Sequence, residues 1–91
     1  MPAVVGRSCL APLIGARGGI AGDFTVTCLG EDDYFMVGSG MAERYHKRFF
    51  DQVVLPAGTT WQSFTDAMAG FNIAGPLARD LLGRLSNADL S

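Results

Sequence analysis

The stretch from residue 24 to residue 37 places the strongest constraint on the fold. Residues 24–29, with the sequence FTVTCL, are rich in β-branched side chains and alternate in polarity, which is typical of a half-buried strand. The acidic stretch 30–33 suits a hairpin turn, and residues 34–37 suit the returning strand. The sequence therefore predicts an antiparallel hairpin.

A helix is predicted to follow this hairpin, because Ser39 suits a helix N-cap. Apolar residues then recur every four positions, so they would share one buried face: Met41, Tyr45, Phe49 and Val53, with Phe50 widening it. Glu43 and Lys47 are spaced to form an ion pair across one helical turn.

A second helix is predicted to begin at Pro76, which needs no amide hydrogen at the first helical position. Its buried stripe would contain Leu77, Leu81, Leu82 and Leu85. Further strands are expected at residues 60–64 and 69–73, with a short one at 3–5. This mixture predicts an α+β fold in which two helices pack on one face of a mainly antiparallel sheet.

Charge and hydropathy argue against two classes of partner. The net charge is −2, and Arg44, Lys47 and Arg48 are interspersed with Glu43 and Asp51, so a solvated helix face is expected rather than a nucleic-acid surface. The apolar runs fall short of the roughly 18 residues that span a bilayer, and the first residues do not resemble a secretion signal. We therefore expect a cytoplasmic protein without membrane or nucleic-acid partners.

The cysteines and the histidine give little indication of chemistry. Cys9 and Cys28 lack metal-ligand spacing, so reduced and at least partly buried thiols are expected, with no metal site. His46 has no evident nucleophile to serve, and we interpret it as a surface side chain.

Asp23 is the candidate site residue. It follows a glycine cluster that predicts a turn, formed by Gly15, Gly18, Gly19 and Gly22, and it precedes the first strand of the hairpin. Its carboxylate could cap the amides of that turn, which is the commoner role of aspartate there. It could instead point into a cleft, where burial would suit it to general-base work or to binding a polar heterocycle.

Two longer segments carry a family resemblance. Residues 17–27, RGGIAGDFTVT, and residues 75–82, GPLARDLL, resemble motifs of the folate-binding domain of the dimethylglycine and sarcosine dehydrogenase/oxidase family. The first segment also resembles a looser motif of the glycine-cleavage T-protein, an aminomethyltransferase. Residues 89–91, DLS, resemble the motif that closes the same region. The resemblance implies one partial T-protein-like domain over residues 1–91, without the flavin-binding motif of the larger enzymes.

The resemblance also implies a ligand and its contacts. Tetrahydrofolate would take up a one-carbon unit from a methylated glycine, with Asp23 as folate contact and proton acceptor, Thr25 as a polar pocket residue, and Val37 at a strand whose main chain lies near the pterin. The partners would be further copies of the chain or the other subunits of a methylamine-oxidising complex.

Three functions remain open on the sequence alone. The chain could be a folate-binding component of one-carbon transfer, a non-catalytic structural or interaction protein that keeps the fold, or a foldable remnant of a larger gene. Catalysis by the chain itself stays undecided.

Overall fold

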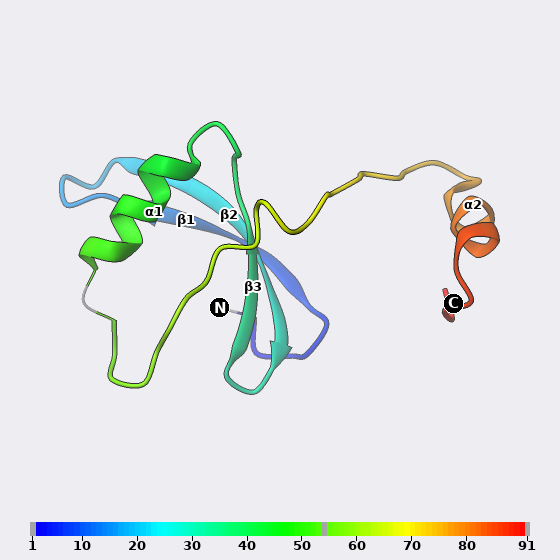
Figure 1. Ribbon diagram of the computed structural model, residues 1–91, viewed down its shortest axis with the longest axis horizontal. Coiled ribbons are helices and arrows are strands. Elements are labelled where there is room, and N and C mark those ends of the chain that lie inside the picture. Colours follow the sequence, from blue (N-terminus) through cyan, green and yellow to red (C-terminus); the bar gives the residue numbers. More distant parts are fainter. Residues whose placement is uncertain (1, 54, 91) are drawn as a thin grey trace. The chain divides into compact units, whose positions relative to one another are not determined.

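The computed structural model describes residues 2–53 and 55–90. The chain divides into two compact units, Met1–Trp61 and Gln62–Ser91. The first unit contains strands β1 (Ser8–Ile14), β2 (Ile20–Gly30) and β3 (Asp33–Val37), followed by helix α1 (Glu43–Gln52). The second contains helix α2 (Ala78–Leu85). The α+β class with an antiparallel sheet is confirmed (Figure 1).

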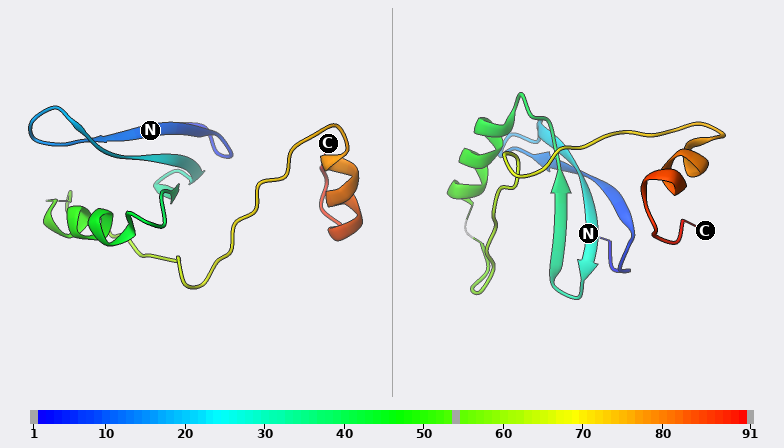
Figure 2. Two further views of the ribbon diagram at one scale, coloured as in Figure 1. Left: turned by 90° about the horizontal axis from the view of Figure 1, so that it is seen from above. Right: turned by 45° about the vertical axis from the view of Figure 1, so that its right-hand side comes forward.

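The three strands form one antiparallel sheet in the order β1-β2-β3, so β2 is the central strand. The predicted hairpin is confirmed as β2 and β3, in which Val26 pairs with Met36 and Cys28 with Tyr34. The sheet and α1 form two layers, which are seen edge-on in the left view of Figure 2. Within the described part of the first unit, one face of the sheet therefore packs on the helix and the other carries no further helix or strand; we call the latter the open face.

Strand β1 replaces the predicted strand at residues 3–5, where the structure has a bend and a turn. Pro12 lies within β1 opposite Asp23. A proline cannot donate to a sheet ladder, but β1 is an edge strand and needs hydrogen bonds on one side only.

The glycine cluster forms the turn between β1 and β2, as predicted. The Gly15 N–H donates to the Gly19 carbonyl at 2.7 Å, and the Gly18 N–H donates to the Gly15 carbonyl at 2.9 Å. Gly18 has a φ of 80°, a left-handed conformation that favours glycine. Gly22 lies beyond this turn, inside β2.

The core of the first unit lies between β2 and α1. The buried hydrophobic residues are Phe24, Val26 and Cys28, which alternate along β2 and point to the helix side. The ring centroid of Phe24 lies 5.7 Å from that of Phe50, which in turn lies 5.8 Å from that of Trp61. Cys28 is buried and Cys9 half-buried, which confirms that both cysteines are at least partly buried.

The buried face of helix α1 matches the predicted one only in part. Phe49 and Phe50 are half-buried, as predicted, but Met41, Tyr45 and Val53 are exposed, and the buried residue of the helix is His46. The prediction assigned the buried face from the spacing of apolar side chains, beginning at Met41. The residues that reach the sheet are aromatic rings one turn apart, and one of them is an imidazole. Ser39 is also not the N-cap: α1 begins after Ala42 without a side-chain cap.

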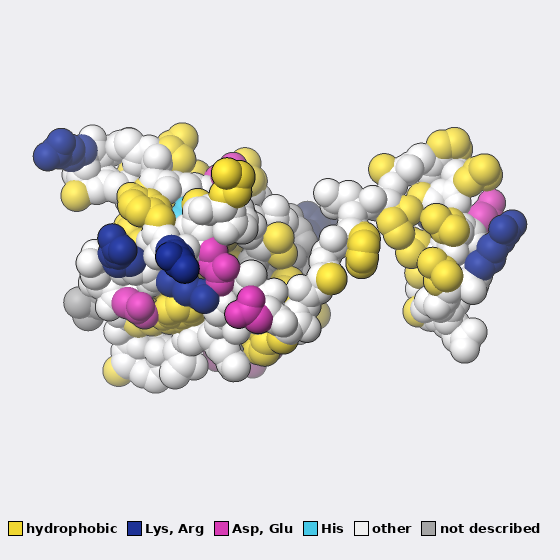
Figure 3. All heavy atoms as spheres, turned by 45° about the horizontal axis from the view of Figure 1, so that its top comes forward, with side chains coloured by type: hydrophobic (Ala, Val, Ile, Leu, Met, Phe, Trp, Pro, Cys, Tyr) yellow, Lys and Arg dark blue, Asp and Glu magenta, His cyan; other side chains and the backbone are white. Residues whose placement is uncertain are grey.

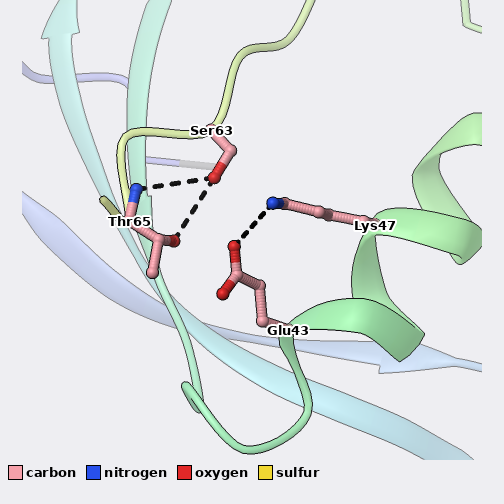
Figure 4. A network of polar contacts seen from close by, with 4 residues as sticks. All are labelled: Glu43, Lys47, Ser63 and Thr65. Carbon is pink, nitrogen blue, oxygen red and sulfur yellow. Dashed lines mark hydrogen bonds and ion pairs between the residues drawn. The ribbon is translucent and has the colours of Figure 1, made fainter. Parts of the chain in front are cut away.

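Glu43 and Lys47, both half-buried residues of α1, form the predicted ion pair, with 2.7 Å between Lys47 Nζ and Glu43 Oε1 (Figure 4). Replacing Lys47 by glutamine is expected to lower the free energy of unfolding by about 0.3–0.5 kcal/mol, the usual contribution of a solvated pair at this spacing. Urea unfolding at low salt and at 1 M salt measures it. The difference in unfolding free energy between wild type and Lys47→Gln should vanish at 1 M salt, because the Debye screening length there is about 3 Å. Arg48→Gln, which removes another positive charge from the same helix, is the matched control.

The second unit is largely extended chain before a short helix. Residues 59–73 were predicted to contain two strands, but in the structure they form neither helix nor strand. The only backbone ladder of the described residues is in the first unit, and a strand needs a paired neighbour to persist. Local turns occur instead, as where the Ser63 hydroxyl donates to Thr65 Oγ1 at 3.3 Å and accepts from the Thr65 N–H at 3.4 Å (Figure 4).

Helix α2 begins at Ala78, two residues after Pro76, so the proline precedes the helix rather than opening it. The expected buried stripe is mostly exposed: Leu77, Leu81 and Leu85 are exposed and Leu82 is half-buried. The packing of α2 on the sheet stays a prediction. Among the described residues, neither helix approaches the length and apolarity of a membrane-crossing segment.

Candidate functional site

Asp23 lies within β2 rather than at the junction with the turn. The strand begins at Ile20, and Asp23 pairs with Pro12 of β1. Because side chains alternate along a strand, the burial of Phe24 toward α1 places Asp23 on the open face, where it is exposed. Its carboxylate takes part in no hydrogen bond or ion pair within the ranges 2–53 and 55–90. Asp23 is thus available on the surface and is not used as a turn cap.

Thr25 and Val37 lie on the same open face as Asp23. Thr25 is two residues further along β2, which places it about 7 Å away along the strand. Val37 of β3 is the cross-strand partner of Thr25, and directly paired residues share a face. The structure therefore brings the three predicted site residues together, with a carboxylate, a hydroxyl and an apolar side chain on one surface.

A pair of hydroxyl groups continues this surface. Thr27 follows Thr25 on the open face and pairs with Ser8 of β1. The two hydroxyl oxygens lie 2.7 Å apart and are hydrogen-bonded. Asp23, Thr25 and Thr27 thus form a polar row along β2, which we call the β2 polar row. Leu10 of β1 and Val37 of β3 flank it. The sequence reasoning missed Ser8, because it did not assign a strand to residues 8–14.

On the helix side, His46 lies directly behind Asp23. The prediction of a surface histidine is wrong, because only 5% of His46 is exposed. Its ring centroid lies 4.7 Å from that of Phe24, with an interplanar angle of 59°. Its ring also fills the space where a side chain at position 22 would begin. The signal for this contact was Gly22, because a glycine inside a strand often marks the close approach of another group.

Described residues around α2 line surface hollows, two of which contain none of Asp23, Thr25 and Val37. One is lined by residues at the end of α2 and after it, including Arg79, Arg84 and Asn87. The other is lined by residues 73–78 and Leu81. Within the part of the chain that the structure describes, His, Cys, Asp and Glu side chains form no group of three that could hold a metal ion.

Figure 3 shows basic and acidic side chains close together on the visible face of the first unit, with apolar side chains between them.

On the open face, 70% of Leu10 and 55% of Val37 are exposed. The open face thus presents one carboxylate, several hydroxyls and flanking aliphatic groups, which together offer hydrogen-bond acceptors, hydrogen-bond donors and apolar contacts.

Comparison with known protein families finds a match. The family model described as GCVT N-terminal domain matches residues 1–91, the whole chain. No curated protein and no solved structure matches the chain.

Proposed function

The chain belongs to the GCVT N-terminal domain family, the folate-binding domain of aminomethyltransferases, and we propose that it binds tetrahydrofolate through Asp23, Thr25 and Val37 as a component of one-carbon transfer. The family model covers the whole chain, residues 1–91. The observation that carries it is the placement of these three residues side by side on the open face.

Each residue has a separate role in this proposal. The Asp23 carboxylate accepts a hydrogen bond from a folate amine and takes its proton as the new C–N bond forms. The Thr25 hydroxyl can both donate to and accept from the heterocycle. Val37 lies on β3, an edge strand, so main-chain groups on the outer side of that strand are open to a ligand. Bound folate supplies the nitrogen that carries the one-carbon unit.

We further propose that the one-carbon unit comes from a methylated glycine, as the resemblance to dimethylglycine and sarcosine enzymes implies. The chain would act in the cytoplasm, where its free thiols would stay reduced. It would work with further copies of itself or as a subunit of a methylamine-oxidising complex. The exposed Leu10 and Val37, which lie on either side of Thr25, would offer apolar contacts to such a partner.

Replacing Asp23 by asparagine should weaken binding of tetrahydrofolate, or of the more stable folinic acid, by about 10-fold to 100-fold. This is the usual effect of losing a hydrogen bond to a charged group, about 1.5–3 kcal/mol. Isothermal titration calorimetry measures the Kd. Glu31→Gln is the control, because Glu31 is an exposed acid in the β2–β3 turn and should leave the Kd unchanged. Equal affinity of Asp23→Asn and wild type would refute the role of this carboxylate.

A second candidate function is an interaction module that retains the fold without binding folate. The exposed aliphatic side chains beside the β2 polar row favour it. The same titration separates the two functions, because an interaction module would show no saturable folate binding at millimolar ligand. Self-association alone would be expected under both.

A further inference from the structure

From the packing behind the candidate site, we infer that His46 is a positioning residue for Asp23, acting through Gly22 and Phe24. The inference rests on the proposed function, because it concerns how the folate-contacting carboxylate is held. His46 lies on the helix side of β2 and Asp23 on the open side, so His46 would not touch the ligand.

The first observation is the contact between His46 and Gly22. A methyl group at position 22 would overlap with Nε2 of His46, and it would lie 3.0 Å from Cε1 and 3.1 Å from Cδ2. The imidazole therefore rests on the glycine backbone itself. It cannot easily move away, because it is almost completely buried.

The second observation is that His46 also contacts Phe24, with the ring centroids 4.7 Å apart. Gly22 and Phe24 are the residues immediately before and after Asp23. One buried side chain therefore holds both neighbours of the candidate carboxylate from behind. The direction of the Asp23 Cα–Cβ bond depends on the backbone torsions of these residues, so the imidazole fixes the direction in which the carboxylate leaves the sheet.

This support matters because β2 is poorly constrained at that point. The pairing of β1 with β2 shifts between Leu13 and Ile14, so Ala21 is left over as a bulge next to Gly22. Glycine adopts many backbone conformations, and a strand interior that contains glycine is weakened. A bulge followed by a glycine would leave Asp23 mobile without a group packed against it. His46 provides that group.

The test uses the full chain and three variants. His46→Ala removes the ring. Phe50→Ala is the structural control, because Phe50 packs on Phe24 from the same helix. Tyr45→Ala is the surface control, because 56% of Tyr45 is exposed. Folinic acid affinity is measured by calorimetry at a temperature where circular dichroism shows each variant to be folded. We expect His46→Ala to raise the Kd by 5-fold to 20-fold, and the two controls to stay within twofold of wild type.

A second readout needs no ligand. Backbone ¹⁵N relaxation should show the order parameter of the Asp23 amide falling from about 0.85, typical of rigid backbone, toward about 0.6 in His46→Ala and remaining high in Phe50→Ala. If the order parameter falls but no variant or wild type binds folinic acid, the positioning stands and the proposed function fails. If Asp23→Asn loses affinity but His46→Ala changes neither the Kd nor the order parameter, the positioning role is overturned and the proposed function stands.

A third experiment tests the contact between His46 and Gly22 with a double variant. Gly22→Ala alone should weaken binding, because its methyl group collides with the imidazole. The double variant Gly22→Ala/His46→Ala should bind more tightly than Gly22→Ala alone, since the smaller side chain at 46 makes room for the methyl group. Gly19→Ala is the control glycine, because a Cβ there meets nothing within 4 Å. Additive losses in the double variant would contradict the inferred contact.

Discussion

Replacing Phe24 by alanine is expected to lower the free energy of unfolding of the first unit by about 3–5 kcal/mol, the range measured for truncating a buried phenylalanine. Phe24 is 7% exposed, and its ring contacts those of His46 and Phe50. Few side chains of the described chain are as well buried, so little else can close the cavity. Small domains have a total stability of about 5–15 kcal/mol, and this one change would remove a large part of it.

Urea unfolding followed by tryptophan fluorescence measures this loss. The chain has one tryptophan, Trp61, and its ring contacts Phe50, so its emission reports on the same cluster. Phe71→Ala is the matched control, because 86% of Phe71 is exposed and its truncation should change stability by less than about 0.5 kcal/mol. A loss below about 1 kcal/mol for Phe24→Ala would mean that this ring is not the centre of the core.

Replacing Gly38 by alanine is expected to destabilise the first unit by about 1–3 kcal/mol, through overpacking rather than a cavity. A methyl group at position 38 would overlap with Cε1 of Phe24 and lie 2.6 Å from its Cδ1. The ring cannot retreat without disturbing His46 or Phe50. Gly38 is therefore needed to let the chain leave β3 past this ring.

Gly40→Ala provides the comparison, because a Cβ at position 40 meets nothing within 4 Å and the residue has no positive φ. The same urea titration should show little change for it. In a Phe24→Leu background, Gly38→Ala should cost less than in wild type, because the flat ring is gone and contacting residues are not additive. An equal cost in both backgrounds would place the strain of Gly38→Ala elsewhere.

The β2–β3 hairpin could be predicted because its signals are local. Alternation from Phe24 to Leu29 and a polar turn specify strand, turn and strand within 14 residues. Strand β1 could not be predicted in this way, since Pro12 argues against a strand unless the strand is known to lie at a sheet edge. That position is a property of the whole sheet. The prediction of strands at 60–64 and 69–73 was wrong for the same reason: these residues have a composition that suits strands, but they pair with no neighbouring strand in the structure.

The family resemblance suggested Asp23, Thr25 and Val37, and their role as a site stays a prediction. The GCVT N-terminal domain family is confirmed over the whole chain. The more specific relation to methylated-glycine enzymes stays a proposal. His46 was missed because its role depends on which face of α1 meets the sheet, and a histidine between Tyr45 and Lys47 gives no local sign of burial.

The central strand carries two sets of residues in alternation, one that makes the core and one that forms the β2 polar row. A slip of β2 by a single residue would exchange these sets: Asp23 would enter the apolar layer and Phe24 would face water. Any slip by an odd number of residues would therefore disrupt the core and the β2 polar row together, whereas a slip by two residues would keep each set on its own face. The burial of the core and the exposure of the β2 polar row thus depend on the same strand pairing.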